Sequence, residues 1–122
     1  MLIFRRFHFD SIAHDNDAAS SNVASVQIPT TPSDPSSSVT PLPILLEGTQ
    51  EVKKFNRQVA DEVRILLALY RIDSKKVDIV FSANLPLKTE TGGMGPEELE
   101  RTKSAFMAAA QSFRILDFGL FA

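Results

Sequence analysis

Two apolar stretches in the C-terminal half of the chain, separated by a few polar residues, limit most strongly the folds open to it. The first is EVRILLALYRI at 62–72 and the second is VDIVFSANLPL at 77–87. Apolar residues at every second position of the first stretch suit a strand, yet from Val52 to Tyr70 the spacing also fits a helix. The polar Asp73-Ser74-Lys75 and the β-branched residues after it favour two arms of an antiparallel hairpin.

Helical patterns flank these strands along the chain. Residues 3–14 predict a short helix that runs into a polar turn at 14–17, and alternation at 23–28 predicts a strand. After a glycine-rich break, Pro96 and three early glutamates predict a second helix with an apolar stripe. The stripe consists of Leu99, Phe106, Ala109, Ala110 and Phe113. A short final strand is predicted at 113–117.

The order of these elements predicts an α+β fold, in which helices pack against an antiparallel β-sheet. At 122 residues the chain supports one small domain, spanning 1–122. Five of its seven prolines fall within 29–43, together with a cluster of serines. Because proline removes backbone donors and the serines offer little to bury, we expect a mobile loop there.

Composition excludes several classes of protein. The chain has no cysteine, so thiolate metal sites and disulfides are impossible. A net charge of -2 gives no reason to expect nucleic acid as the main partner. The densest basic stretch, with Lys53, Lys54, Arg57 and Arg64, lacks interleaved aromatics and is typical of a solvated face. No apolar run is long enough to cross a membrane.

Catalytic constellations are not evident in the sequence. The only histidines are His8 and His14, and with nearby aspartates they suit a solvated turn better than a metal site. The glycines at 92–95 lack the lysine and hydroxyl residues of a phosphate-binding loop. We therefore expect a binding module without a cofactor, and not an enzyme.

Five segments in series resemble the Ran guanine nucleotide release factor family, also called the Mog family. The segments are FHFDSIAHDND at 7–17, ILLEGTQ at 44–50, VADEV at 59–63 leading into LLALYRI, VDIVFSANLP at 77–86, and the ending at 113–122. The fold of that family is similar to that of the PsbP proteins of photosystem II. The resemblance implies an α/β/α sandwich, in which 62–72 and 77–87 are paired strands.

The resemblance also implies a function. Members of the family bind the small GTPase Ran and promote release of its guanine nucleotide, which supports protein import into the nucleus. Such a protein regulates a GTPase without catalytic chemistry of its own, and we expect it in the nucleus and the cytoplasm. The alternative is an interaction or scaffold module that keeps the fold without promoting nucleotide exchange.

One departure from the family pattern concerns the N-terminus. Family members have further strands and an acidic region ahead of the FHFDSIAHDND segment, so we expect a partial, N-terminally truncated domain with weakened activity. An incomplete sheet exposes an edge, which predicts self-association. The remaining exposed polar candidates for partner binding are Asp10, Asp15, Asp17 and Gln50. A polar turn at 14–17 and a strand end at Gln50 also explain these residues.

Overall fold

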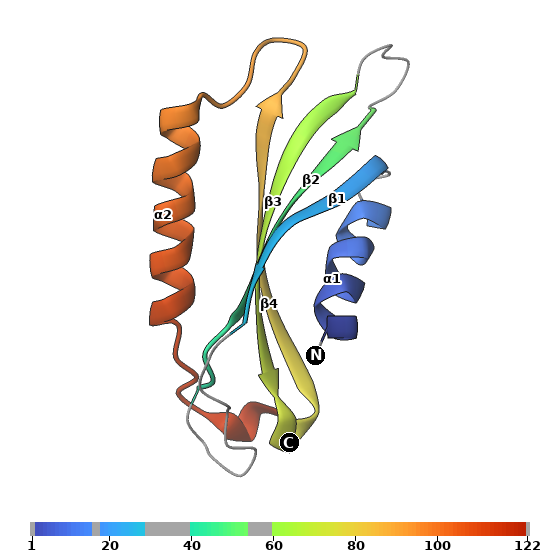
Figure 1. The fold of residues 1–122 in the computed structure, drawn as a ribbon. Coiled ribbons are helices and arrows are strands. Elements are labelled where there is room, and N and C mark those ends of the chain that lie inside the picture. The colour runs from blue at the N-terminus through green and yellow to red at the C-terminus, as the bar shows by residue number, and fades with distance from the viewer. Residues whose placement is uncertain (1, 16–17, 29–39, 54–59, 122) are drawn as a thin grey trace.

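A four-stranded antiparallel sheet with one helix on each face forms the fold (Figure 1). The computed structural model describes residues 2–15, 18–28, 40–53 and 60–121. The elements are α1 (Leu2–Asp15), β1 (Ala18–Gln27), β2 (Ile44–Val52), β3 (Asp61–Ile72), β4 (Val77–Lys88) and α2 (Pro96–Ser112), with single 3-10 turns at Asp73–Lys75 and Phe118–Phe121. The strand order is β1-β2-β3-β4, which confirms the predicted α+β class.

Strand β3 is the centre of the fold and settles the ambiguity between helix and strand. It pairs with β2 on one side and with β4 on the other, both antiparallel. Ile65, Leu67 and Leu69 are fully buried on the face toward α1, and Ala68 and Tyr70 are fully buried on the face toward α2. A strand buried on both faces explains why its apolar run is continuous.

The core beneath α1 depends on a close contact between an aromatic ring and a glycine. Phe9, which is 0% exposed, points from α1 into a cluster of aliphatic side chains. The buried aliphatic members are Ile44 and Leu46 of β2 with Ile65, Leu67 and Leu69 of β3. A Cβ added to Gly48 would lie 2.5 Å from two ring atoms of Phe9 and 2.8 Å from the carbonyl oxygen of Asn22. Only glycine leaves room for the ring at this point in β2.

We therefore expect Gly48→Ala to lower the free energy of unfolding by about 1–3 kcal/mol, because the Phe9 ring must move out of a packed core. Urea denaturation followed by circular dichroism measures the change. Gly95→Ala is the matched control, since an added Cβ there meets nothing within 4 Å. It should cost less than Gly48→Ala, about 0.5 kcal/mol, because the expected change is only the poorer N-cap propensity of Ala at the start of α2. Equal losses in the two variants would contradict the role given to Gly48.

On the opposite face, three aromatic rings join α2 to the sheet. Ring centroids lie 4.9 Å apart for Tyr70 and Phe113, 4.7 Å for Phe81 and Phe113, and 5.6 Å for Tyr70 and Phe81. The Tyr70 hydroxyl donates a hydrogen bond to the carbonyl oxygen of Ala110, near the end of the helix. This bond satisfies one of the carbonyls that a helix C-terminus leaves unpaired. Burial raises the pKa of the Tyr70 hydroxyl.

Three predictions about local structure need correction or restriction. The predicted strand at 113–117 is wrong, because the Ile115 amide donates to the Thr40 hydroxyl at 2.7 Å and the segment joins no sheet. Ala109 is exposed, so it does not belong to the apolar stripe of α2. Within the predicted loop at 29–43, residues 40–43 have no regular structure and the others lie outside the described residues.

Candidate functional site

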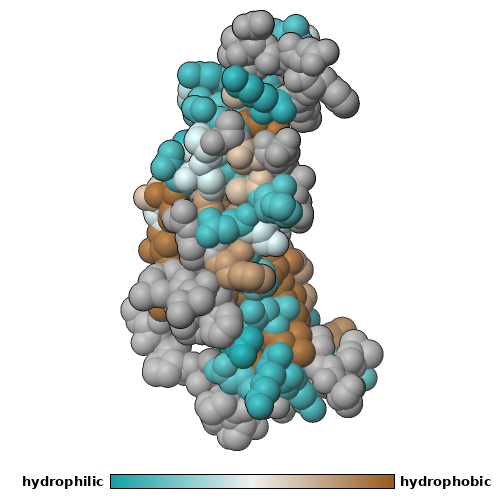
Figure 2. All heavy atoms as spheres, turned by 90° about the vertical axis from the view of Figure 1, so that its right-hand side faces the viewer, coloured by the Kyte–Doolittle hydropathy of each residue, from teal (hydrophilic) through white to brown (hydrophobic). Residues whose placement is uncertain are grey.

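Two of the three predicted acidic residues, Asp10 and Asp15, belong to α1. Asp10 is exposed on α1, and Asp15 is the last residue of that helix, so the helix extends into the turn predicted at 14–17. Asp17 lies outside the described residues. Figure 2 faces the side of the molecule that carries α1, where hydrophilic and hydrophobic residues share the surface. Phe7, 63% exposed, is one of the hydrophobic residues of α1.

Gln50 is not an exposed candidate, which corrects the prediction. It is 0% exposed, and its side-chain nitrogen donates to the carbonyl oxygen of Phe9 at 3.4 Å. The residue lies within β2, whose burial alternates from Ile44 to Val52 with every second position buried. That alternation, read in the sequence, would have placed Gln50 on the inner face. Its side chain joins α1 to the sheet and is not part of the exposed surface.

A charged cluster also joins α1 to the hairpin of β3 and β4. The His8 ring nitrogen Nε2 lies 3.0 Å from Asp78 Oδ2, and Arg71 Nη1 lies 2.8 Å from Asp78 Oδ1. Burial by itself raises the pKa of Asp78, but Arg71 and His8 together hold it below its ordinary value. The sequence separates His8 from Asp78 by seventy positions, so no local pattern reveals the contact.

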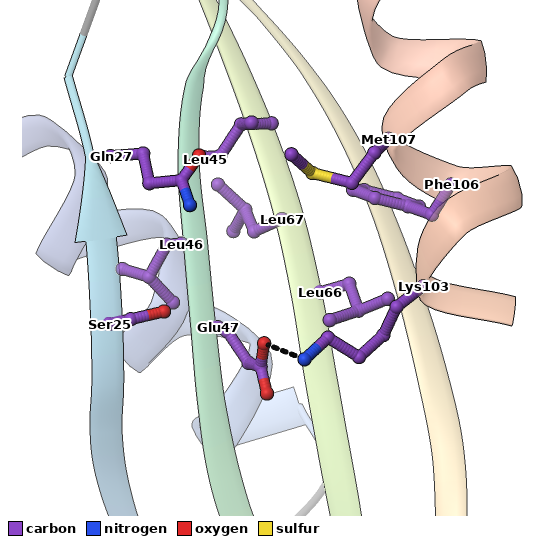
Figure 3. Close-up of a pocket in the computed structure, with 10 residues that line it drawn as sticks. All are labelled: Ser25, Gln27, Leu45, Leu46, Glu47, Leu66, Leu67, Lys103, Phe106 and Met107. Carbon is purple, nitrogen blue, oxygen red and sulfur yellow. Dashed lines mark ion pairs between the residues drawn. The ribbon is translucent and has the colours of Figure 1, made fainter. Parts of the chain in front are cut away.

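A groove runs between α2 and the open half of the sheet (Figure 3). Its lining residues, which we call the α2 groove, are Ser25, Gln27, Leu45, Leu46, Glu47, Leu66, Leu67, Lys103, Phe106 and Met107. Leu45 of β2, Leu66 of β3 and the α2 residues Phe106 and Met107 supply apolar side chains to it, and β1 supplies the uncharged polar residues Ser25 and Gln27. The groove encloses about 40 Å³, which is room for a few water molecules.

Glu47 is the electrostatic centre of the α2 groove. Its carboxylate lies 2.9 Å from the Lys103 ammonium and also accepts a hydrogen bond from the Arg64 guanidinium. Burial alone raises the pKa of Glu47, but Lys103 and Arg64 outweigh it and lower the pKa below its ordinary value of 4.5. The ionised carboxylate therefore links α2 to β2 and β3, as Figure 3 shows for Lys103.

Because the pKa of Glu47 is lower in the folded chain than in the unfolded chain, its contribution to stability is complete above the ordinary carboxylate pKa. It is lost as pH falls through the lowered value. We expect the free energy of unfolding to decrease across this acidic range, and Glu47→Gln to show a smaller decrease than the wild-type chain. Urea denaturation at a series of pH values tests this. Parallel curves for the two chains would contradict the role of Glu47.

The described residues show no metal-binding group and no spanning helix. Within 2–15, 18–28, 40–53 and 60–121, no three His, Cys, Asp or Glu side chains are placed to hold a metal ion. His8 contacts Asp78, whereas His14 is exposed. In the same part of the chain, no helix is long and apolar enough to cross a membrane.

Comparison with known proteins identifies the class to which this fold and surface belong. The family described as Ran-interacting Mog1 protein matches residues 4–86, from α1 to Pro86 near the end of β4. A Ran guanine nucleotide release factor from Danio rerio is 30% identical over 126 residues, which cover 95% of this chain and 67% of the relative. No solved structure matches. The chain belongs to the family of Ran-interacting Mog1 proteins.

Proposed function

We propose that this chain binds the GTPase Ran and promotes release of its guanine nucleotide. The family match carries the proposal, because it spans nearly all of α1, the sheet except the last residues of β4, and the core cluster beneath α1. The name of the Danio rerio relative supports the more specific activity, release of the nucleotide. Membership of the family of Ran-interacting proteins does not depend on that activity.

The proposed mechanism needs binding energy and no covalent step. A protein promotes nucleotide release when it binds the nucleotide-free GTPase more tightly than the nucleotide-bound form. By thermodynamic linkage, the nucleotide then weakens binding of the protein by the same factor. The surface that contacts Ran must therefore fit a conformation from which the nucleotide has left.

We place this surface on α1 and the beginning of β1. The family match includes α1 and ends at residue 86, before α2 begins at Pro96. Asp10 is exposed there, so its carboxylate can pair with a cationic side chain of the GTPase. Gln50 would act indirectly, through its hydrogen bond to the helix that carries Asp10.

We expect the purified chain to accelerate release of fluorescent GDP from Ran, and Asp10→Lys to reduce the acceleration about tenfold by placing a like charge against a cationic partner. The measurement is the fluorescence decay after excess unlabelled GDP is added. Glu98→Lys makes the same charge change at an exposed site on α2, on the other face of the sheet. This control should behave as the wild-type chain.

Two outcomes would change the proposal in different ways. Binding to Ran without any acceleration would leave a Ran-interacting module that does not promote exchange, which is the alternative function. Equal loss of activity in Asp10→Lys and Glu98→Lys would remove the surface from α1. A chain that neither binds Ran nor changes its nucleotide release would overturn the proposal as a whole.

The proposed function also implies where in the cell the chain is found. We propose that the chain supports nuclear protein import and is present in both the nucleus and the cytoplasm. Imaging of a fluorescently tagged full chain in living cells tests the location. Strict exclusion of the tagged chain from the nucleus would contradict it.

A further inference from the structure

The sheet ends in two edge strands, β1 and β4, whose outer sides differ in chemistry. The strand order β1-β2-β3-β4 leaves each of them with one neighbouring strand among the described residues. An edge strand presents backbone N–H and C=O groups that can pair with a further strand. The two edges therefore have to be compared for features that prevent such pairing.

Strand β4 carries several features that block its edge. Pro86 lacks a backbone N–H, and its carbonyl already accepts a hydrogen bond from the Met94 amide at 2.7 Å. The returning chain passes so close that a Cβ at Gly93 would lie 2.2 Å from the carbonyl oxygen of Leu87. Asp78 and Lys88 place charges near the two ends of the strand. Each of these features discourages edge-to-edge pairing.

Strand β1 has no comparable charge or proline. Its sequence from Ala18 to Gln27, AASSNVASVQ, contains neither a charged residue nor a proline. On the face toward α1, Val23 and Val26 pack against the core and hold the strand in place. The exposed side chains are small or uncharged, namely Ser20, Asn22, Ala24, Ser25 and Gln27. The strand is thus anchored on one face while its outer edge is uncharged.

We propose that the outer edge of β1 is a self-association surface, where a second copy of this chain pairs antiparallel across a two-fold axis. Two four-stranded sheets would then form one continuous sheet. In a two-fold antiparallel pair, a residue near the axis lies against its own copy, so a charge there would approach the same charge. The absence of charge in β1 avoids this repulsion wherever along the strand the axis falls.

The regular part of β1 locates the centre of the proposed contact. Pairing with β2 is shifted between Ala18 and Ser20 and again between Val23 and Ser25. From Ser20 to Val23, four consecutive residues keep a regular register against Glu51 to Gly48. A regular segment offers evenly directed backbone groups, whereas bulges divert them. We therefore place the two-fold axis within the segment Ser20–Val23.

The first test is the mass of the full chain in solution, measured by sedimentation equilibrium over a wide range of concentration. We expect the mass to rise toward twice that of the monomer as concentration increases. Asn22→Lys places two ammonium groups near the axis and should weaken association about tenfold. Ser82→Lys is the matched control, because Ser82 is an exposed residue of the other edge strand. It should leave association unchanged.

The second test locates the contact directly and uses the fact that the chain has no cysteine of its own. Single cysteines are introduced at Ser20, Asn22 and Ser25 of β1, and at Ser82 and Asn84 of β4, and each chain is oxidised. A single cysteine can form a disulfide between two chains only where it lies close to the same residue of the second chain. We expect efficient cross-linking at one of the three β1 positions, Ser20, Asn22 or Ser25, and none at the two β4 positions.

The outcomes separate the possibilities. A chain that stays monomeric at every concentration overturns the proposal, as does cross-linking confined to β4. Association that Asn22→Lys leaves unchanged, with no cross-linking in β1, also overturns it and moves the contact elsewhere. Circular dichroism of each variant shows that it is folded, so loss of association cannot be mistaken for loss of structure. None of these results depends on whether the chain binds Ran.

Discussion

Burial of β3 on both faces is the constraint on which the rest of the structure depends. Its backbone groups are paired with β2 and β4, while its side chains enter two separate cores. Burying one large aliphatic side chain contributes about 1.5–3 kcal/mol. Leu67 and Leu69 gain this contribution only when α1 covers one face, and Tyr70 gains its own only when α2 covers the other. The two helices are therefore required by a single strand.

The helices meet this requirement from offset positions over the sheet, which leaves surface for function. Helix α1 makes most of its contacts with β1 and β2, whereas α2 makes most of its contacts with β3 and β4. Phe9 fixes the first helix on Gly48, and the aromatic cluster fixes the second. The α2 groove lies at the border between α2 and the open part of the sheet, and there Glu47 links β2 to the helix through charge. The offset between the two helices thus both stabilises the fold and leaves part of the sheet surface available.

Sequence patterns predicted those elements whose cause is local. The alternation from Val63 to Leu69 predicted a strand, and the glycines followed by Pro96 predicted the start of α2. The pairing of Glu47 with Lys103 was beyond such patterns, because it depends on how α2 is placed across the sheet. The segment at 113–117 was predicted as a strand from its apolar residues, but its amide at Ile115 bonds to a side chain outside the sheet.

Among the candidate residues, the sequence predicted exposure at Asp10 correctly and at Gln50 wrongly. Gln50 was predicted to be exposed because it is polar, although its position in the alternating pattern of β2 is an inward one. Gln50 tolerates burial because the carbonyl of Phe9 accepts its amide hydrogen. Whether Asp10, Asp15 and Asp17 touch Ran stays a prediction, as it depends on a partner.

The hydroxyl of Tyr70, bonded to the end of α2, gives the molecule a built-in optical reporter. The chain has one tyrosine and no tryptophan. Its near-ultraviolet signal therefore comes mainly from a ring that lies between the sheet and a single helix. Loosening of α2 would change this signal while α1 and its core stay in place. Spectroscopy of the unlabelled chain can thus distinguish the two layers that the sheet separates.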